Sequence, residues 1–276
     1  MLKRKVRDFL VGPVTAIVVT LAVFAFVGGL LVVLEPSSTT AAAPATGGTG
    51  ISSSLDYAPP GQYGSGTLGP WQKLLRRISP EDDIRDALTF NGIFMFGDSI
   101  AVQDESGLER LLAARTGDTI AVHNWSGQPT SAAVDALEGW SRDYGLPGRI
   151  LMAVGTNDIF NPPAFGAQVE RAMQIAGPNR TVYWVNVEVS RFRQDADAQA
   201  SDRANSAWIN QQLEEAAMRH PNLRIIHWAE YLAAQPDGLA KYLRDGVHTT
   251  EPIGADARNE LIAQAIEDAD GDQSSR

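Results

Sequence analysis

Four short polar clusters in the sequence hold the side chains best suited to chemistry. They are Gly97-Asp98-Ser99, Trp125-Ser126-Gly127-Gln128, Gly155-Thr156-Asn157-Asp158 and Asp245-Gly246-Val247-His248. The first three follow predicted β-strands, and the fourth lies near the C-terminal end of the chain. Together they supply an alcohol, an imidazole, a carboxylate and several hydrogen-bond donors, which is a set of groups that can attack an ester.

Each of these groups has a role in ester cleavage. Ser99 supplies an alcohol nucleophile, which is weak until a base removes its proton. His248 is the natural base, and Asp245, three residues earlier, can orient its ring. The backbone N–H groups of Ser99 and Gly127 and the side-chain amide of Asn157 can stabilise the oxyanion. We therefore predict Ser99, Asp245 and His248 as catalytic residues, with Ser99, Gly127 and Asn157 forming an oxyanion hole.

The stretch around Ser99 also has a plain structural interpretation. An apolar run, 93–96, stops at Gly97-Asp98-Ser99, and Asp or Ser at such a position commonly caps the helix that follows. Taken alone, this stretch favours capping. The other polar clusters favour catalysis, because ligand sites of open α/β sheets lie beyond the carboxyl ends of the strands.

Strand and helix patterns alternate from residue 92 onward. Strands are predicted at Gly92–Phe96, Thr119–Asn124, Arg149–Val154, Thr181–Val189 and Leu223–Trp228. Helices are predicted between and after them, at Gly107–Arg115, Thr130–Tyr144, Phe165–Ala176, Ser201–Arg219 and Gly254–Ile266. This alternation predicts a parallel sheet with helices on both faces. Two short helices, Trp71–Ile78 and Pro80–Leu88, are predicted before it, and a polar tail, Asp268–Arg276, after it.

The four clusters resemble the sequence blocks of the SGNH hydrolases, also called the GDSL esterase/lipase superfamily. Those blocks carry Ser in G-D-S, a Gly, Asn in G-x-N-D and His in D-x-x-H. Ser99, Gly127, Asn157 and His248 match them in the same order, and Asp245 completes the triad. The resemblance covers roughly residues 92–266. It implies a flavodoxin-like α/β fold, a three-layer αβα sandwich with a five-stranded parallel sheet, and an esterase that uses no metal or organic cofactor.

Two departures and two further residues bear on the site. Ile100 stands where the family name has Leu, and the segment 249–254 after His248 is slightly longer than the family's usual step into its last helix. The G-x-S-x-G elbow of α/β-hydrolases is absent, because its last position is Ala101, and this disfavours that other family. Phe160 follows the Asn157 cluster and is a candidate wall of a small acyl pocket, although core packing explains it equally well. Arg191 follows the fourth predicted strand and is a candidate substrate contact, although a solvated loop arginine is the plainer interpretation.

The N-terminal part of the chain predicts a membrane anchor. Residues 9–34 carry no charge over 26 positions, and as a helix they would be about 39 Å long, enough to cross a ~30 Å hydrocarbon core with tilt. The basic tail 1–8 before this span places the N-terminus in the cytoplasm. Cleavage at Ala41-Ala42-Ala43 remains an alternative. Residues 35–70, rich in Ser, Thr, Ala, Gly and Pro, predict a flexible linker to a domain at 71–276.

The charge of the chain excludes one class of partner. The first 34 residues carry four basic side chains and one acidic one, so removing their +3 from the total of −10 leaves −13 for the remainder. Such an acidic domain is repelled by phosphate backbones, which argues against a nucleic-acid partner. The chain has no cysteine, which excludes disulfides, thiolate metal sites and a cysteine nucleophile.

These observations predict a single-pass membrane protein with an extracytoplasmic serine esterase domain. Its substrate is expected to be a small acyl ester, such as an O-acetyl group on an envelope glycan or lipid. An O-acyltransferase that uses the same triad is an alternative, since both reactions pass through an acyl-Ser99 intermediate. A non-catalytic envelope binding or scaffold module is a further alternative, and the intact set of site residues argues against it.

Overall fold

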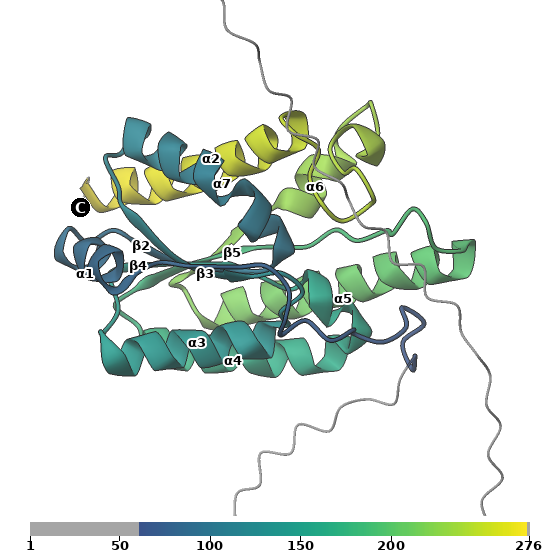
Figure 1. The fold of residues 1–276 in the computed structure, drawn as a ribbon, viewed down its shortest axis with the longest axis horizontal. Coiled ribbons are helices and arrows are strands. Elements are labelled where there is room, and N and C mark those ends of the chain that lie inside the picture. Colours follow the sequence, from purple (N-terminus) through teal and green to yellow (C-terminus); the bar gives the residue numbers. More distant parts are fainter. Residues whose placement is uncertain (1–60, 275–276) are drawn as a thin grey trace, which may run out of the picture. The chain divides into compact units, whose positions relative to one another are not determined.

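The computed structural model describes residues 61–274 of the chain, which form an αβα arrangement around one sheet (Figure 1). The strands are β1 (Arg76–Ile78), β2 (Ile93–Gly97), β3 (Ile120–Trp125), β4 (Arg149–Ala153), β5 (Thr181–Val185) and β6 (Leu223–Ile226). The helices are α1 (Glu81–Thr89), α2 (Ser99–Arg115), α3 (Thr130–Asp143), α4 (Phe165–Ala176), α5 (Ala196–Arg219), α6 (Trp228–Ala233) and α7 (Ile253–Ser274). Short 3₁₀ helices are η1 (Thr156–Phe160), η2 (Pro162–Ala164) and η3 (Leu239–Lys241).

The sheet has six strands in the order β1-β3-β2-β4-β5-β6, and its orientation is mixed. The five strands from β2 to β6 are parallel to their neighbours, whereas β1 runs antiparallel to β3 at one edge. The prediction of an α/β sheet between helices is therefore confirmed. The prediction of a purely parallel five-stranded sheet is wrong, because the sheet has a sixth strand, β1, which is antiparallel.

The edge strand also corrects the predicted helix at Trp71–Ile78. Residues 76–78 pair with β3 in the register Arg76 to Trp125 and Ile78 to His123. Apolar residues at 71, 74, 75 and 78 have helical spacing, but Ile78 remains 42% exposed on the edge of the sheet. Because β3 leaves one edge free, the gain from pairing with it overrides a weak local helical preference.

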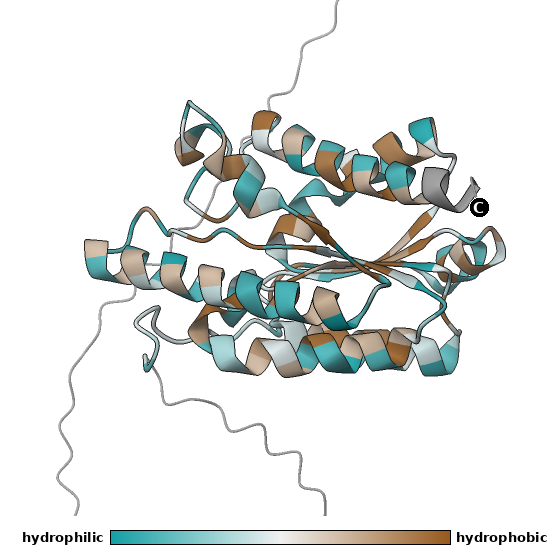
Figure 2. Ribbon diagram, turned by 180° about the vertical axis from the view of Figure 1, so that it is seen from behind, coloured by the Kyte–Doolittle hydropathy of each residue, from teal (hydrophilic) through white to brown (hydrophobic). Residues whose placement is uncertain are grey.

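Side chains alternate between the two faces along each central strand. In β2, Phe94 and Phe96 pack with α3, α4 and α5 on one face, whereas Ile93 and Met95 pack with α2, α6 and α7 on the other. Residues of α1, such as Ile84, join the first of these cores. Figure 2 shows the mostly hydrophobic strands between helices of mixed polarity. Burial on both faces explains why the strands appear in the sequence as continuous apolar runs.

Several boundaries differ from the predicted ones. Strand β5 ends at Val185 instead of Val189, because its partner β6 ends at Ile226. Helix α2 begins at Ser99, eight residues before the predicted start, and α7 continues through the predicted polar tail as far as Ser274. Helix periodicity is weak at both places, so the extra turns could not be predicted from the sequence.

The strand order places a switch point at the centre of the sheet. From β2 the chain crosses to β3 on one side, and the following strand, β4, lies on the other side of β2. In open α/β sheets the crevice at such a point, beyond the carboxyl ends of the strands, is the usual ligand site. Ser99 follows β2 and Asn157 follows β4, so both lie at this crevice.

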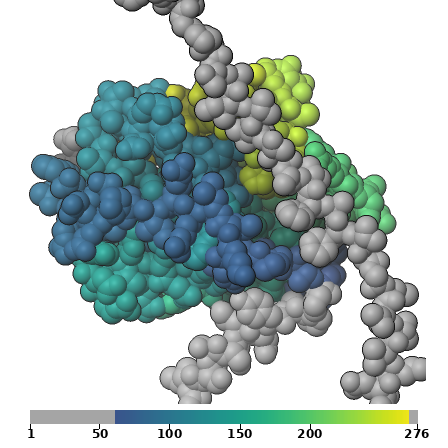
Figure 3. Space-filling view, in the orientation of Figure 1, coloured from purple at the N-terminus to yellow at the C-terminus, as the bar shows by residue number. Residues whose placement is uncertain are grey.

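The first described residues lie on the surface of the domain, shown in dark blue in Figure 3. Residues 63–70 belong to the segment predicted as a linker by composition, yet Ser65 is buried and its hydroxyl accepts a hydrogen bond from Asn205 on α5. Within residues 61–274, no helix is both long and apolar enough to cross a membrane. The predicted anchor, 9–34, and the basic tail lie outside the described residues.

Candidate active site

The turn between β2 and α2 presents Ser99 at the carboxyl edge of the sheet. A Cβ at Gly97 would collide with Ala101 and come within 2.6 Å of the Asn124 side chain, so only glycine fits there. Asp98 caps α2, since its Oδ1 accepts a hydrogen bond from the Ile100 N–H at 3.0 Å. The capping interpretation thus holds for Asp98, which leaves the Ser99 hydroxyl available for another contact.

That contact is with His248, which in turn contacts Asp245. The distance from Ser99 Oγ to His248 Nε2 is 2.9 Å, and the distance from His248 Nδ1 to Asp245 Oδ2 is also 2.9 Å. With the proton on Nδ1 donated to Asp245, Nε2 is free to accept the serine proton. The side chains of His248 and Asp245 are 27% and 38% exposed, so the pair is accessible from solvent.

The Asp245 carboxylate is held in its charged form by its surroundings. Partial burial alone would raise the pKa of Asp245, but hydrogen bonds from the side chain and backbone of His248 and from the Val247 N–H hold that pKa well below its usual range. The two backbone donors reach Oδ1 at 2.8 Å and 3.0 Å. A charged, fixed carboxylate of this kind stabilises the imidazolium that forms when His248 takes a proton.

The loop that carries Asp245 and His248 is fixed from two sides. Gly246 has φ of +86°, and a Cβ there would collide with the carbonyl oxygen of Ser190. The backbone N–H of Ser190 donates a hydrogen bond to the Gly246 carbonyl at 2.9 Å. On the other side, Thr249 Oγ1 donates to the buried Asp104 of α2. Helix α2, which begins at Ser99, therefore also holds the loop that carries His248.

The three predicted oxyanion donors come from three loops joined by one glutamine. Gln128 is fully buried, and its Nε2 donates to the Gly97 carbonyl at 2.5 Å. Its own backbone carbonyl accepts a hydrogen bond from Asn157 Nδ2 at 3.1 Å. Gly127, with φ of +76°, precedes it in the same turn. The turn after β2, the turn after β3 and the helix η1 after β4 therefore hold one another in place.

Two buried carboxylates complete the support of these loops. Thr156 Oγ1 bonds to Asp98 Oδ2, which joins the β4 loop to the nucleophile turn. Asp158 Oδ2 accepts from the N–H and the hydroxyl of Thr130 at 3.0 Å and 2.8 Å, so it caps α3 from outside that helix. Burial raises the pKa of Asp158 to about 7, and the bonds from Thr130 oppose that shift.

The two candidate substrate residues occupy different environments. The Arg191 guanidinium bonds to the buried carboxylate of Asp202 at 2.7 and 2.8 Å and to the Ser65 carbonyl at 2.6 Å. It also lies 5.2 Å from the centre of the Phe160 ring. Phe160 itself lines a cavity beside Asn157. A contact of Arg191 or Phe160 with substrate stays a prediction.

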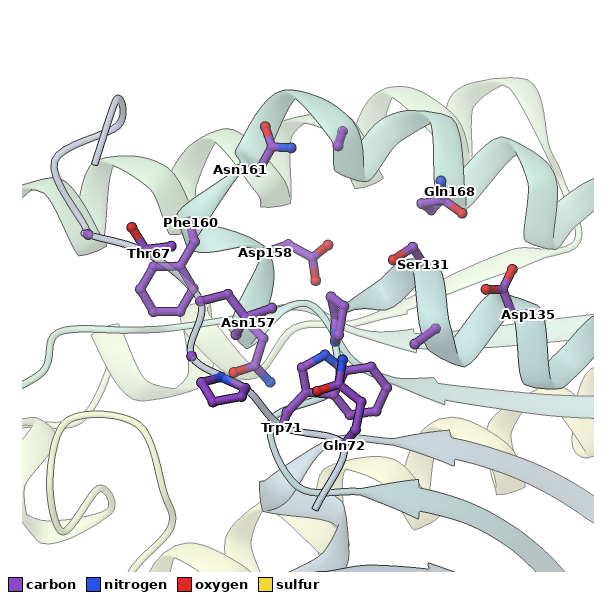
Figure 4. A pocket seen from close by; sticks show the side chains of 17 residues that line it. Thr67, Trp71, Gln72, Ser131, Asp135, Asn157, Asp158, Phe160, Asn161 and Gln168 are labelled. Carbon is purple, nitrogen blue, oxygen red and sulfur yellow. The ribbon is translucent and has the colours of Figure 1, made fainter. Parts of the chain in front are cut away.

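A cavity of about 530 Å³ opens beside Asn157 (Figure 4). Residues 66–72 form one wall, and residues of α3, η1 and α4 form the other. Asn157, one of the predicted oxyanion donors, lines the cavity, whereas Ser99 and His248 are not among the lining residues. The cavity is thus adjacent to the reacting groups and separate from the Ser99–His248 pair.

Three parts of this site are not predicted from the sequence. Gln128 and Thr156 each belong to one of the polar clusters, but neither has a predicted role. The segment 63–72 was assigned to the linker and to a predicted helix. The only signal in the sequence for Gln128 is its place between Gly127 and Pro129 in a polar cluster, and its burial is visible only in the structure. The sequence holds no signal for the position of residues 63–72, because their contacts are with residues far away in the chain.

The assembled groups can carry out nucleophilic acyl transfer. An alcohol hydrogen-bonded to an oriented imidazole has an internal base, and neighbouring amide N–H groups can stabilise negative charge on an acyl oxygen. No group of three or more His, Asp or Glu side chains able to hold a metal ion occurs within residues 61–274.

Comparison with known proteins shows the fold. No protein-family model and no curated protein sequence matches the chain. The C-terminal catalytic domain of peptidoglycan O-acetyltransferase A from Streptococcus pneumoniae is 20% identical, with 65% of this chain and 94% of that domain covered at a TM-score of 0.52. A lipase/acylhydrolase from Enterococcus faecalis is 19% identical, with 64% and 96% covered at a TM-score of 0.54. A GDSL-like lipase from Bacteroides thetaiotaomicron is 18% identical, with 67% and 98% covered at a TM-score of 0.51.

Proposed function

We propose that this protein is a serine ester hydrolase that works through an acyl-serine intermediate. The observation that carries the proposal is the pair of 2.9 Å contacts that join Ser99 to His248 and His248 to Asp245. The similarity of fold to a lipase/acylhydrolase and a GDSL-like lipase supports the same chemistry. The triad is recognised by its geometry and its roles, which do not depend on sequence position.

The first half of the reaction forms the acyl-enzyme. Ser99 Oγ attacks the acyl carbon while its proton passes to His248 Nε2, and Asp245 stabilises the resulting imidazolium. The carbonyl oxygen becomes an oxyanion bound by the N–H groups of Ser99 and Gly127 and by the amide of Asn157. The bond to the leaving alcohol then breaks, and His248 returns its proton to that alcohol.

The second half transfers the acyl group to water. His248 takes a proton from water, the hydroxide oxygen attacks the acyl carbon, and the bond to Ser99 Oγ breaks as His248 returns the proton to it. The products are a carboxylic acid and the free enzyme. No cofactor is needed, because the serine, the imidazole and the amide donors balance every proton and charge.

The proposed substrate is a small acyl ester on a glycan or lipid of the cell envelope. This part of the proposal rests on the predicted anchor at residues 9–34, with the N-terminus cytoplasmic and the catalytic domain outside. The −13 charge of the chain beyond the anchor disfavours docking on anionic lipid. A glycan O-acyl group is therefore the preferred member of this substrate class.

O-acyltransfer is a second candidate, and one comparison favours it. The similar fold from Streptococcus pneumoniae is described as the catalytic domain of a peptidoglycan O-acetyltransferase. In a transferase the acyl-Ser99 intermediate would be attacked by a sugar hydroxyl in place of water. Partition of the acyl group between water and an added oligosaccharide, measured by mass spectrometry, separates the two reactions. A third candidate, a non-catalytic binding or scaffold module, is disfavoured by the hydrogen-bonded triad.

The test of the proposed function uses the full-length chain and p-nitrophenyl acetate. We expect a fluorophosphonate probe to label Ser99, and Ser99→Ala to abolish both labelling and hydrolysis. Ser106→Ala is a matched control, since Ser106 lies exposed on the same helix. Asn157→Ala should lower kcat by about 10²–10³-fold with a smaller effect on KM, as for loss of one oxyanion donor. Full activity in Ser99→Ala would contradict the proposal.

A further inference from the structure

The cavity beside Asn157 is closed on one side by a segment that is fixed at both ends. We call residues 66–72 the strap. Before it, Asn205 of α5 donates to the Tyr63 carbonyl at 2.8 Å and to Ser65 Oγ at 2.9 Å. Arg191 donates to the Ser65 carbonyl at 2.6 Å. These three bonds join the chain before the strap to α5 and to the loop after β5.

The other end of the strap is fixed beside the oxyanion turn. The Trp71 ring meets the Trp125 ring edge to face, with centroids 4.9 Å apart. The Ser126 N–H donates to the Leu75 carbonyl at 2.9 Å. A Cβ at Gly127 would lie 2.9 Å from the Trp71 Cβ, so the strap packs closely on this turn. The strap thus spans from α5 to the oxyanion hole, and the cavity lies beneath it.

The lining of the cavity combines aromatic rings with amide and hydroxyl groups. In Figure 4, Asn157 lies between the rings of Phe160 and Trp71. Gln168 on α4 is 95% buried, since 5% of its surface is exposed, and its Oε1 has no hydrogen-bond partner among the described residues. A buried amide oxygen without a partner costs free energy, which a ligand hydroxyl would offset.

The charges around the cavity argue for a neutral ligand. Of the described residues that line it, none is Lys, Arg or His. Asp135 lies on the rim, and its carboxylate is paired with Arg171 at 2.6 Å. Asp158 bonds to Thr130, and burial raises its pKa to about 7. The cavity therefore offers no cation to an anionic group and no free carboxylate to a strongly cationic one.

We propose that this cavity is a subsite for a neutral, hydroxyl-rich ring, namely the sugar that forms the alcohol part of the ester. The inference rests on the proposed function and deepens it by naming what lies next to the oxyanion hole. Rings such as Trp71 and Phe160 present flat apolar faces to a sugar, and Gln168, Ser131 and Gln72 present groups that bond hydroxyls.

The alternative occupant is the acyl chain, and the lining disfavours it. A long acyl chain gains most from a continuous apolar wall, and it would leave the Gln168 oxygen buried without a partner. A short acyl group such as acetyl would leave most of the 530 Å³ empty. A sugar ring fills more of the space and can bond the amide, so the sugar is the occupant that satisfies both the volume and the polar atoms.

The catalytic test compares two acetyl esters with different alcohols. Full-length Gln168→Leu should lower kcat/KM for mono-O-acetylated chitotriose about tenfold, mainly through KM, and leave p-nitrophenyl acetate unchanged within twofold, because one hydroxyl bond is lost. Gln72→Ala, an exposed change on the strap, should lower kcat/KM for the sugar ester about threefold and leave p-nitrophenyl acetate unchanged. Gln174→Leu on the same helix, exposed and outside the cavity, should change neither ester.

The remaining outcomes decide between the occupants. Equal losses on both esters, or no loss on the sugar ester, would overturn the subsite. An increase in kcat/KM of Gln168→Leu on p-nitrophenyl decanoate would also overturn it, since the cavity would then hold the acyl chain.

A binding measurement keeps this test separate from the proposed function. Saturation-transfer NMR of Ser99→Ala with chitotriose should show binding that Gln168→Leu weakens, whether or not the enzyme hydrolyses p-nitrophenyl acetate; lack of binding would count against the subsite.

Discussion

Gln128 joins the turn that carries Ser99 to Asn157, one of the predicted oxyanion donors. Its side chain bonds to the carbonyl of Gly97, two residues before Ser99, and its backbone carbonyl accepts the amide of Asn157. It is fully buried and follows Gly127 directly. Displacement of a reacting group by about 1 Å can cost 10²-fold in rate. We therefore regard Gln128 as a positioning residue, which acts through its neighbours.

Gln128→Met tests this role, because Met keeps the length of the side chain and removes its hydrogen bonds. We expect kcat on p-nitrophenyl acetate to fall by about 10- to 100-fold with KM changed by less than threefold, because the donors move while the cavity stays. Gln235→Met is the matched control, since Gln235 bonds to Tyr231 and Tyr242 away from the site. A similar loss of kcat in both variants would point to general destabilisation and refute a positioning role.

At the level of single residues, the sequence was informative where chemistry limits the choice of side chain. An alcohol, an imidazole and a carboxylate at Ser99, His248 and Asp245 have few equivalents, so their types and order, together with the family resemblance, predicted a triad. The structure shows the two contacts within it at 2.9 Å, and the catalytic roles stay a prediction. For Arg191, the sequence showed only that a positive charge follows a predicted strand, and it did not show the partners of that charge. Its bonds to Asp202 and Ser65 depend on how α5 and the first described residues meet.

Secondary-structure elements were predictable where burial imposes a pattern. The strands β2, β4 and β5 are mostly apolar runs because both faces of the sheet are covered there, and the order of the parallel strands along the chain could be predicted from the sequence. Strand β1 carries no such pattern, since its three residues are all exposed and it is defined only by pairing with β3. Elements defined by a distant partner are the ones that the sequence could not predict.

Helix α3 illustrates an element whose stability depends on a residue outside it. Its N-cap, Pro129, makes no side-chain bond, and Asp158 from η1 accepts the Thr130 N–H and hydroxyl instead. Burial raises the pKa of Asp158 to about 7, against about 3.9 in an unfolded chain. Between pH 4 and 7, roughly, the folded protein keeps a proton that the unfolded chain has lost, so the free energy of unfolding falls as pH rises through this window.

Asp158→Asn should remove this part of the pH dependence, because an amide oxygen can still accept from Thr130 and does not titrate. We expect the unfolding temperature of the wild type to fall more between pH 5 and pH 8 than that of Asp158→Asn. Glu188, whose pKa burial also raises to about 7, should leave a residual slope in the variant. Asp143→Asn on the exposed end of α3 serves as the control. Equal slopes for Asp158→Asn and the wild type, measured by scanning calorimetry, would refute the assignment.

At the scale of the whole molecule, charge is divided between the two ends of the predicted anchor. Four basic residues precede residues 9–34, and the chain beyond them carries −13. Basic flanks stay in the cytoplasm, which predicts that the catalytic domain faces outward. The net negative charge of the chain beyond the predicted anchor would disfavour contact with anionic headgroups.

The absence of cysteine from the chain makes this topology directly testable, since any introduced thiol is the only one. Ser106→Cys places a thiol at an exposed position of α2, and Val6→Cys places one in the basic tail. If the domain is outside, a membrane-impermeant maleimide added to intact cells, or to spheroplasts where an outer barrier exists, should label Ser106→Cys at once and Val6→Cys only after permeabilisation.

Replacing Lys3, Arg4, Lys5 and Arg7 by Gln and adding Ser37→Arg and Ser38→Arg should reverse the labelling pattern, because the basic flank then lies on the other side of the span. Labelling of Val6→Cys but not Ser106→Cys in intact cells would place the Ser99 site in the cytoplasm, and the envelope glycan would then be excluded as its substrate.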